Sequence, residues 1–100
     1  MGRLAVTAAV MTLLTGPAMA NEIERACLRS DRPGTNRSLC GCIQDAANLT
    51  LNSRDQRLAA TFFANPDRAQ QIRSSSTQRD EVFWKRYENF GKTAEHYCRL

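Results

Sequence analysis

Four cysteines constrain this chain more than any other feature of its sequence. They stand at Cys27, Cys40, Cys42 and Cys98 of 100 residues. An even number of cysteines in a short exported chain is typical of a disulfide framework, here two bridges. A zinc site is the competing interpretation. It is disfavoured because no C-x-x-C pair occurs and His96 is the only histidine.

The first twenty residues are typical of a secretory signal peptide. A positive start (MGR) precedes an uncharged stretch (LAVTAAVMTLL) and a small-residue ending (TGPAMA). Ala18-Met19-Ala20 predicts cleavage after Ala20. The apolar stretch is shorter than the roughly 20 residues that span a bilayer. We therefore expect one domain, residues 21–100, that is exported to a periplasm or secreted, without membrane insertion of the mature chain.

The spacing of the cysteines disfavours one of the three possible pairings. A Cys40–Cys42 bond would close a strained small ring, which is easily reduced. On a helix, residues two apart point about 200° apart, so these two thiols face different neighbours. We expect Cys27 to pair with one of them and Cys98 with the other. Cys27–Cys40 with Cys42–Cys98 is the preferred arrangement.

The composition of the expected domain explains why it needs cross-links. Without the leader, the hydrophobic share falls from 42% to about 36%, and the net charge falls from +4 to +3. So few large apolar side chains form a thin core, whose burial barely offsets the conformational entropy lost on folding. Each disulfide stabilises a small domain by about 2–4 kcal/mol, which is comparable with its whole stability.

Helix signals follow one another along the whole expected domain, and no strand pattern occurs. The fold class is therefore all-α, a small bundle of four to five short helices stapled by two disulfides. The expected helices cover residues 21–29, about 37–50, 53–65, 66–74 and 78 to about 99. Their predicted starts are Thr35 or Asn36 as a cap, a Ser53–Gln56 capping box, Asn65 before Pro66, and Thr77.

The helical periodicity predicts which faces turn inward. The last helix has the clearest apolar stripe. All seven aromatic residues lie between Phe62 and Tyr97. We therefore expect the core to form where the third and fifth helices meet. The inward positions of the last helix are Phe83, Tyr87, Phe90, Ala94, Tyr97 and Cys98.

Basic residues in the expected domain are mostly arginine, eleven against two lysines. Arginine presents a planar fork of donors that suits carboxylates and phosphates, so an anionic partner is one interpretation. The other is an ordinary solvated surface, because acidic residues are interspersed throughout. Nucleic-acid binding would require a concentrated basic patch, and a net charge of +3 with alternating signs is not one.

Trp84, Lys85 and Arg86 form an aromatic and cationic cluster in the last predicted helix. Trp84 lies about 100° away from Phe83 around the helix, off the main apolar stripe. It either seals the core or belongs to an exposed recognition surface. Both interpretations remain open at the level of sequence.

Catalytic patterns are absent from the sequence. His96 stands beside Glu95 but has no nucleophile if the cysteines are oxidised. We find no paired carboxylates, triad, phosphate loop or metal-ligand spacing, and expect neither enzyme activity nor a cofactor. Thiol–disulfide exchange at Cys40-Gly41-Cys42 would require a free thiol. Two glycosylation sequons, at Asn36 and Asn48, matter only in a secretory pathway with that machinery.

Five parts of the expected domain are distinctive in sequence. They are Arg37–Gln44 (RSLCGCIQ), Asp55–Phe63 (DQRLAATFF), Phe83–Tyr87 (FWKRY), Phe90–Glu95 (FGKTAE) and Cys98. These segments, which cover most of the expected domain, resemble a family of small exported bacterial proteins that are commonly labelled "arginine transporter". The resemblance implies an accessory or solute-binding role in amino-acid transport, since the expected domain has no membrane-spanning segment.

The sequence thus leads to three hypotheses. The first is a non-catalytic, disulfide-stabilised binding or accessory protein of the periplasm, whose partner is an envelope protein or a small anionic or amino-acid solute. The second is an accessory component of arginine transport. The third is thiol–disulfide exchange at Cys40 and Cys42.

Overall fold

Five helices make up the computed structural model, which describes residues 21–99. They are α1 (Glu22–Arg29), α2 (Arg37–Thr50), α3 (Ser53–Ala64), α4 (Pro66–Ser74) and α5 (Gln78–Cys98). The described part of the chain contains no strand, so the all-α prediction is confirmed. The expected signal peptide, residues 1–20, lies outside the described residues, as does residue 100.

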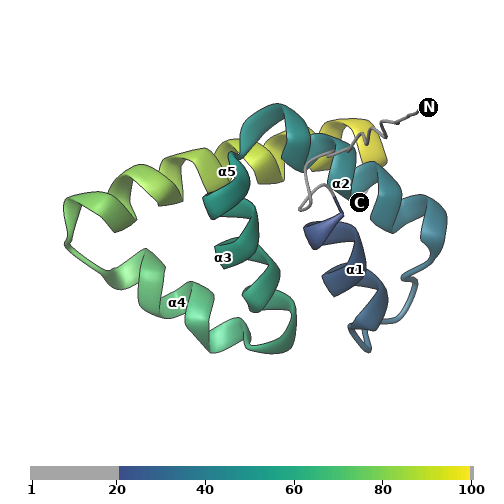
Figure 1. Ribbon diagram of the computed structural model, residues 1–100, viewed down its shortest axis with the longest axis horizontal. Coiled ribbons are helices and arrows are strands. Elements are labelled where there is room, and N and C mark those ends of the chain that lie inside the picture. Colours follow the sequence, from purple (N-terminus) through teal and green to yellow (C-terminus); the bar gives the residue numbers. More distant parts are fainter. Residues whose placement is uncertain (1–20, 100) are drawn as a thin grey trace, which may run out of the picture.

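α5 is the longest of the five helices and runs along one edge of the molecule (Figure 1). α2 lies beside the C-terminal half of α5, and α1 and α3 descend side by side from this pair. α4 then returns from the end of α3 to the start of α5. Some helices that follow one another in the chain pack together, and in addition α1 packs on α3, and α5 packs on both α2 and α3.

Side chains at the helix starts satisfy backbone amides that have no partner within the helix. Asn36 accepts a hydrogen bond from the Leu39 amide, and Thr77 accepts one from the Asp80 amide. Both were among the predicted caps and are confirmed. At the start of α3 the prediction was wrong, because Asn52 is the cap and accepts from the Asp55 amide at 2.8 Å.

Ser53 is therefore the first residue of α3, and Gln56 does not return to the helix start. Gln56 is instead buried and donates to the Leu51 carbonyl oxygen at 3.2 Å. At the α3–α4 junction, Pro66 occupies the first helical position as predicted. Asn65 precedes it but makes no side-chain cap, and its amide donates to the Thr61 carbonyl oxygen at the end of α3.

The core extends beyond the predicted contact between α3 and α5 and includes α2. Phe62 of α3 meets Phe83 and Tyr87 of α5 edge to face, with ring centroids 6.1 and 5.2 Å apart. The more extensive packing of α5, however, is against α2. Ala46 and Ala47 of α2 are buried and allow close approach of helices, a contribution that a search for large apolar side chains does not detect.

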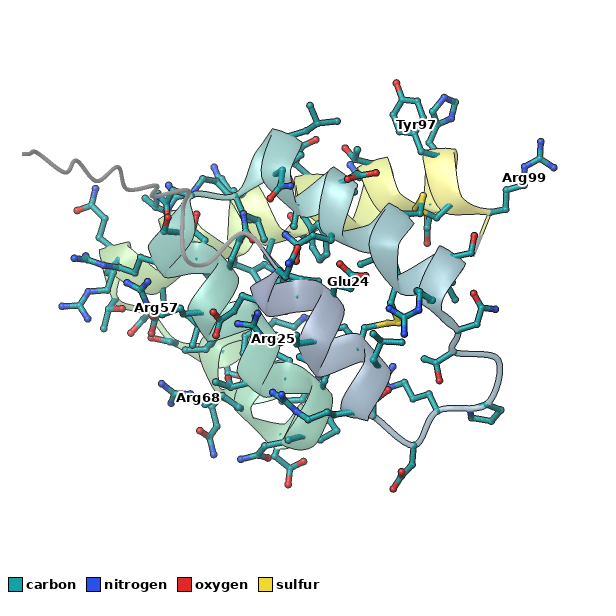
Figure 2. The ribbon with its side chains drawn as sticks, turned by 45° about the vertical axis from the view of Figure 1, so that its right-hand side comes forward. Glu24, Arg25, Arg57, Arg68, Tyr97 and Arg99 are labelled. Atoms are coloured by element: carbon teal, nitrogen blue, oxygen red, sulfur yellow. A yellow bond between two sulfur atoms is a disulfide. The ribbon has the colours of Figure 1, made fainter. Side chains whose placement is uncertain are left out.

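Tyr97 is the one member of the predicted α5 stripe that the fold leaves outside. It is 66% exposed, and Figure 2 shows its ring projecting from the end of α5 away from the other helices. The neighbouring Cys98 turns toward α2, where it is bonded to Cys42. Since adjacent helical residues differ by about 100° in direction, Tyr97 lies at the outer edge of this contact, where it borders a surface hollow together with Leu49 of α2.

Two disulfides join the helices in the preferred pairing. Cys27–Cys40 links α1 to α2 with Cα atoms 5.6 Å apart, and Cys42–Cys98 links α2 to α5 with Cα atoms 5.8 Å apart. Cys40 and Cys42 point to opposite sides of α2, as their spacing predicts. α2 is therefore the element to which both ends of the domain are covalently attached.

A buried amide network adds polar contacts between α1, α2 and α3. Gln44 is 3% exposed; its Oε1 accepts from the Glu24 amide and its Nε2 donates to Gln56 Oε1 at 2.9 Å. Asn48 Oδ1 accepts from both glutamine side chains. Because the buried glutamine groups are satisfied by one another and by the backbone, the network stabilises one register of the three helices.

Candidate functional site

An ion pair with a buried carboxylate and a partly exposed guanidinium links the start of α3 to the middle of α5. Asp55 is 4% exposed, and its two carboxylate oxygens accept hydrogen bonds from Arg86 Nε at 2.6 Å and Nη2 at 3.0 Å. The hydrogen bonds to Asp55 raise the pKa of the Arg86 guanidinium above its ordinary value, although burial acts in the opposite direction. Two parallel bonds of this kind hold the guanidinium plane in one orientation.

This ion pair lies in the wall of a cleft between α3 and α5. The cleft has a volume of about 510 Å³, within the range of small-ligand sites. Its lining comes from two stretches of sequence about twenty residues apart. The residues are Asn52, Ser53, Arg54, Asp55, Arg57, Leu58, Arg79, Asp80, Phe83 and Arg86.

Positive charge dominates the cleft. Four arginines and two aspartates give a formal charge of +2, in a chain whose total is only +4. Arg86 is held by Asp55, whereas Arg54, Arg57 and Arg79 are exposed. Within residues 21–99, no carboxylate oxygen lies within 4.0 Å of these three guanidinium groups. Among the described residues, the donors of these three arginines therefore have no acidic partner, and their side chains are exposed.

The starts of two helices border the same cleft. α3 begins at Ser53 and α5 begins at Gln78, so the first turns of both helices contribute lining residues. The positive ends of the helix dipoles therefore add to the charge of the arginines. The combined field favours a negatively charged group over a neutral or cationic one.

The structure separates the residues of the predicted Trp84–Lys85–Arg86 cluster. Arg86 lines the cleft. Trp84 is half-buried and packs against the core, with its ring centroid 5.0 Å from that of Tyr87. Lys85 is exposed on a different hollow, beside Val82 and Glu81. Successive residues of a helix point in different directions, so a run of three cannot share one face.

Sequence reasoning missed Arg54, Arg57 and Arg79. The available signal was their spacing, because Arg54 and Arg57 are three residues apart, and Arg79 and Arg86 are seven apart. Both intervals place two side chains on one face of a helix. The sequence could not show that these two faces meet, since that depends on how α3 packs against α5.

The four cysteines do not offer a free thiol in the described chain, where each is disulfide-bonded. Cys27 and Cys40 are 1% and 0% exposed, so an external thiolate has no direct path to their sulfur atoms. Cys42 and Cys98 are half-buried. Among residues 21–99, no three His, Cys, Asp or Glu side chains are grouped so as to hold a metal ion.

The remaining sequence candidates lie away from the cleft. His96 is exposed and packs edge to face on Tyr97, with ring centroids 4.7 Å apart. Tyr97 and Leu49, which is 74% exposed, flank an apolar hollow of about 220 Å³ beside Cys42. The two sequon asparagines have structural partners, since both Asn36 and Asn48 accept hydrogen bonds through Oδ1.

Comparisons with known proteins give no family for this chain. No family model, no curated protein and no solved structure matches it. In the part of the chain that the structure describes, no helix is both long and apolar enough to cross a membrane.

Proposed function

We propose that this protein is an exported, non-catalytic binding protein that recognises a negatively charged group through the cleft between α3 and α5. The observation that carries the proposal is the convergence of Arg54, Arg57 and Arg79 on one cleft without carboxylate partners among residues 21–99. The signal-peptide pattern and the two disulfides support export.

The energetics of the cleft favour an anionic ligand. Three arginines gathered on one cleft repel one another, and a bound anion relieves that repulsion. Arginine donors also match carboxylate and phosphate oxygens in a two-pronged geometry. The Asp55–Arg86 pair prepares one wall in advance, because Arg86 loses little further side-chain entropy when a ligand binds.

Free arginine, the solute that the family resemblance suggests, is a less suitable occupant of this cleft. Its carboxylate fits the arginines, but its guanidinium would enter a region of formal charge +2. Asp80 is the single lining carboxylate that is not already paired with an arginine among the described residues. A role in arginine transport would therefore rest on a surface other than this cleft.

The test is an NMR titration of the processed, oxidised protein with inorganic phosphate at constant ionic strength. We expect saturable shifts of backbone amides in residues 52–58 and 79–86, and we expect them to weaken at high salt. L-arginine at the same concentrations should leave these amides unchanged. Shifts that are absent from the cleft, or spread evenly over all arginine-bearing surfaces, would contradict the proposal.

Matched charge variants separate the cleft from general electrostatics. The triple variant Arg54→Gln, Arg57→Gln, Arg79→Gln should lose the phosphate response. The control triple variant Arg37→Gln, Arg68→Gln, Arg73→Gln removes the same charge from exposed positions outside the cleft and should retain it. Equal losses in both triple variants would show that only net charge matters.

A further inference from the structure

We infer that the ligand of the cleft is an organic anion with two acidic groups joined by an apolar spacer. This inference rests on the proposed function and deepens it by naming the ligand class. It follows from the order of the side chains along the two walls of the cleft.

The α5 wall alternates positive, apolar and positive. Arg79, Phe83 and Arg86 are at positions i, i+4 and i+7, which share one face of a helix. That face turns toward α3, because Arg86 bonds to Asp55 and Phe83 contacts Phe62. Over seven residues the helix rises by about 10.5 Å. Arg79 therefore originates two turns from Arg86, whose guanidinium Asp55 already holds, and the nearly buried ring of Phe83 lies between them.

The α3 wall contributes two further arginines and a second apolar side chain. Arg54 and Leu58 are four residues apart and share a face, and Arg57 adjoins it. Leu58 is half-buried and packs against the core, so it forms a fixed apolar surface within the cleft. Figure 2 shows Arg57 on α3, at the opposite end of the molecule from Tyr97.

The two walls of the cleft favour a ligand with two acidic groups over a small anion with a single charged group. A single small anion would engage one cluster of arginines and leave Leu58 uncovered. An anion with two acidic groups can bind Arg79 at one end and Arg54 or Arg57 of the opposite wall at the other, while its methylene chain covers Leu58. Both ends then bind as one event, so the second contact forms at a high effective concentration.

The experiment compares ligands that differ from suberate either in the second acidic group or in the length of the spacer. Suberate and octanoate have eight-carbon chains, and malonate has two carboxylates but a short spacer. By calorimetry at constant ionic strength, we expect suberate to bind at least about tenfold more tightly than octanoate or malonate. The alkane bisphosphonate with the same spacer distinguishes a phosphate ligand from a carboxylate ligand; preferential binding of either divalent form supports the inference.

A single-site variant supplies the structural control. Arg79→Gln should reduce the affinity for suberate to that for octanoate, because it removes one end of the site, whereas Arg73→Gln should leave the difference intact. Equal affinities for suberate, octanoate and malonate, with shifts still confined to the cleft amides, would overturn the divalent ligand but leave the proposed function standing. No response of the cleft to any anion, phosphate included, would overturn both.

Discussion

Asp55 is the one charged side chain that is buried among the residues that the structure describes. It is 4% exposed, whereas its partner Arg86 keeps 41% of its side chain accessible. The carboxylate also lies in the first turn of α3, where the helix dipole favours a negative charge. The pair therefore joins α3 to α5 and orients a guanidinium in the cleft at the same time.

Asp55→Asn should lower the free energy of unfolding by about 1.5–3 kcal/mol, the range for a hydrogen bond to a charged group. Asp67→Asn is the matched control, since Asp67 is exposed in the first turn of α4, and its loss should stay within about 0.5 kcal/mol. Urea denaturation measures both. Equal effects would show that the ion pair adds nothing beyond the dipole interaction.

Tyr87 of α5 is half-buried in the core, and this affects the ionisation of its phenol. Burial raises the pKa of its phenol above the ordinary value, and the nearby positive charge of Arg32 partly opposes this. A raised folded-state pKa means that the fold favours the protonated phenol. The stabilisation is therefore complete below the unfolded-state pKa of about 10 and is lost as the pH rises through the folded-state pKa.

The Tyr97→Phe variant makes this measurable, because it leaves Tyr87 as the only tyrosine. Its absorbance titration should have a midpoint above that of N-acetyl-tyrosinamide under the same conditions. A midpoint equal to or below that of the reference compound would contradict the burial of Tyr87.

At the scale of elements, helix boundaries were the most predictable property of the chain. The five helices begin and end within one or two residues of the expected limits. Caps and proline positions act over a single turn, so they can be recognised from neighbouring residues. The error at α3 also arose locally, because Asn52 and Ser53 are both good caps and only one of them precedes the first turn.

The cap of α3 can be tested by two alanine substitutions in adjacent positions. Asn52→Ala should destabilise the protein by about 1 kcal/mol, because it removes the acceptor of the Asp55 amide. Ser53→Ala should change the stability by less than about 0.5 kcal/mol, since Ser53 makes no cap. Thermal or urea unfolding distinguishes the two, and the reverse order would restore the Ser53 capping box.

At the scale of the whole molecule, the two disulfides differ in their surroundings. Cys27–Cys40 is enclosed between α1 and α2, with both residues almost fully buried. Cys42–Cys98 lies closer to the surface and attaches the end of α5 to α2. A reductant therefore reaches Cys42–Cys98 without unfolding the core, whereas it reaches Cys27–Cys40 only after the helices separate.

Limited reduction should therefore proceed in two steps. At low dithiothreitol, alkylation and peptide mass spectrometry should label Cys42 and Cys98 before Cys27 and Cys40. The protein should remain helical after the first step, because the Cys27–Cys40 bond still joins α1 to α2. Simultaneous labelling of all four cysteines, or labelling of Cys27 first, would contradict this order.

The cleft shows why the site was less predictable than the fold. Arg86 was recognised, but as part of a cluster with Trp84 and Lys85 that the helix directs to three different surroundings. The arginines that share the cleft with it are Arg54 and Arg57 of α3 and Arg79 of α5, and α4 separates these two helices in the chain. Sequence neighbours on a helix diverge by about 100°, so adjacency in the chain is a poor guide to adjacency in space.

The sequence by itself determined the class of the fold, the helices and the opposite directions of Cys40 and Cys42, which exclude a bond between these two. These depend on hydrogen bonds and side-chain directions within a few residues, which local order specifies. Only the tertiary structure decided that Asp55 is buried, that Tyr97 is exposed and that four arginines share one cleft. Those outcomes depend on which helix faces meet, and that follows from the packing of the whole chain around its core and disulfides.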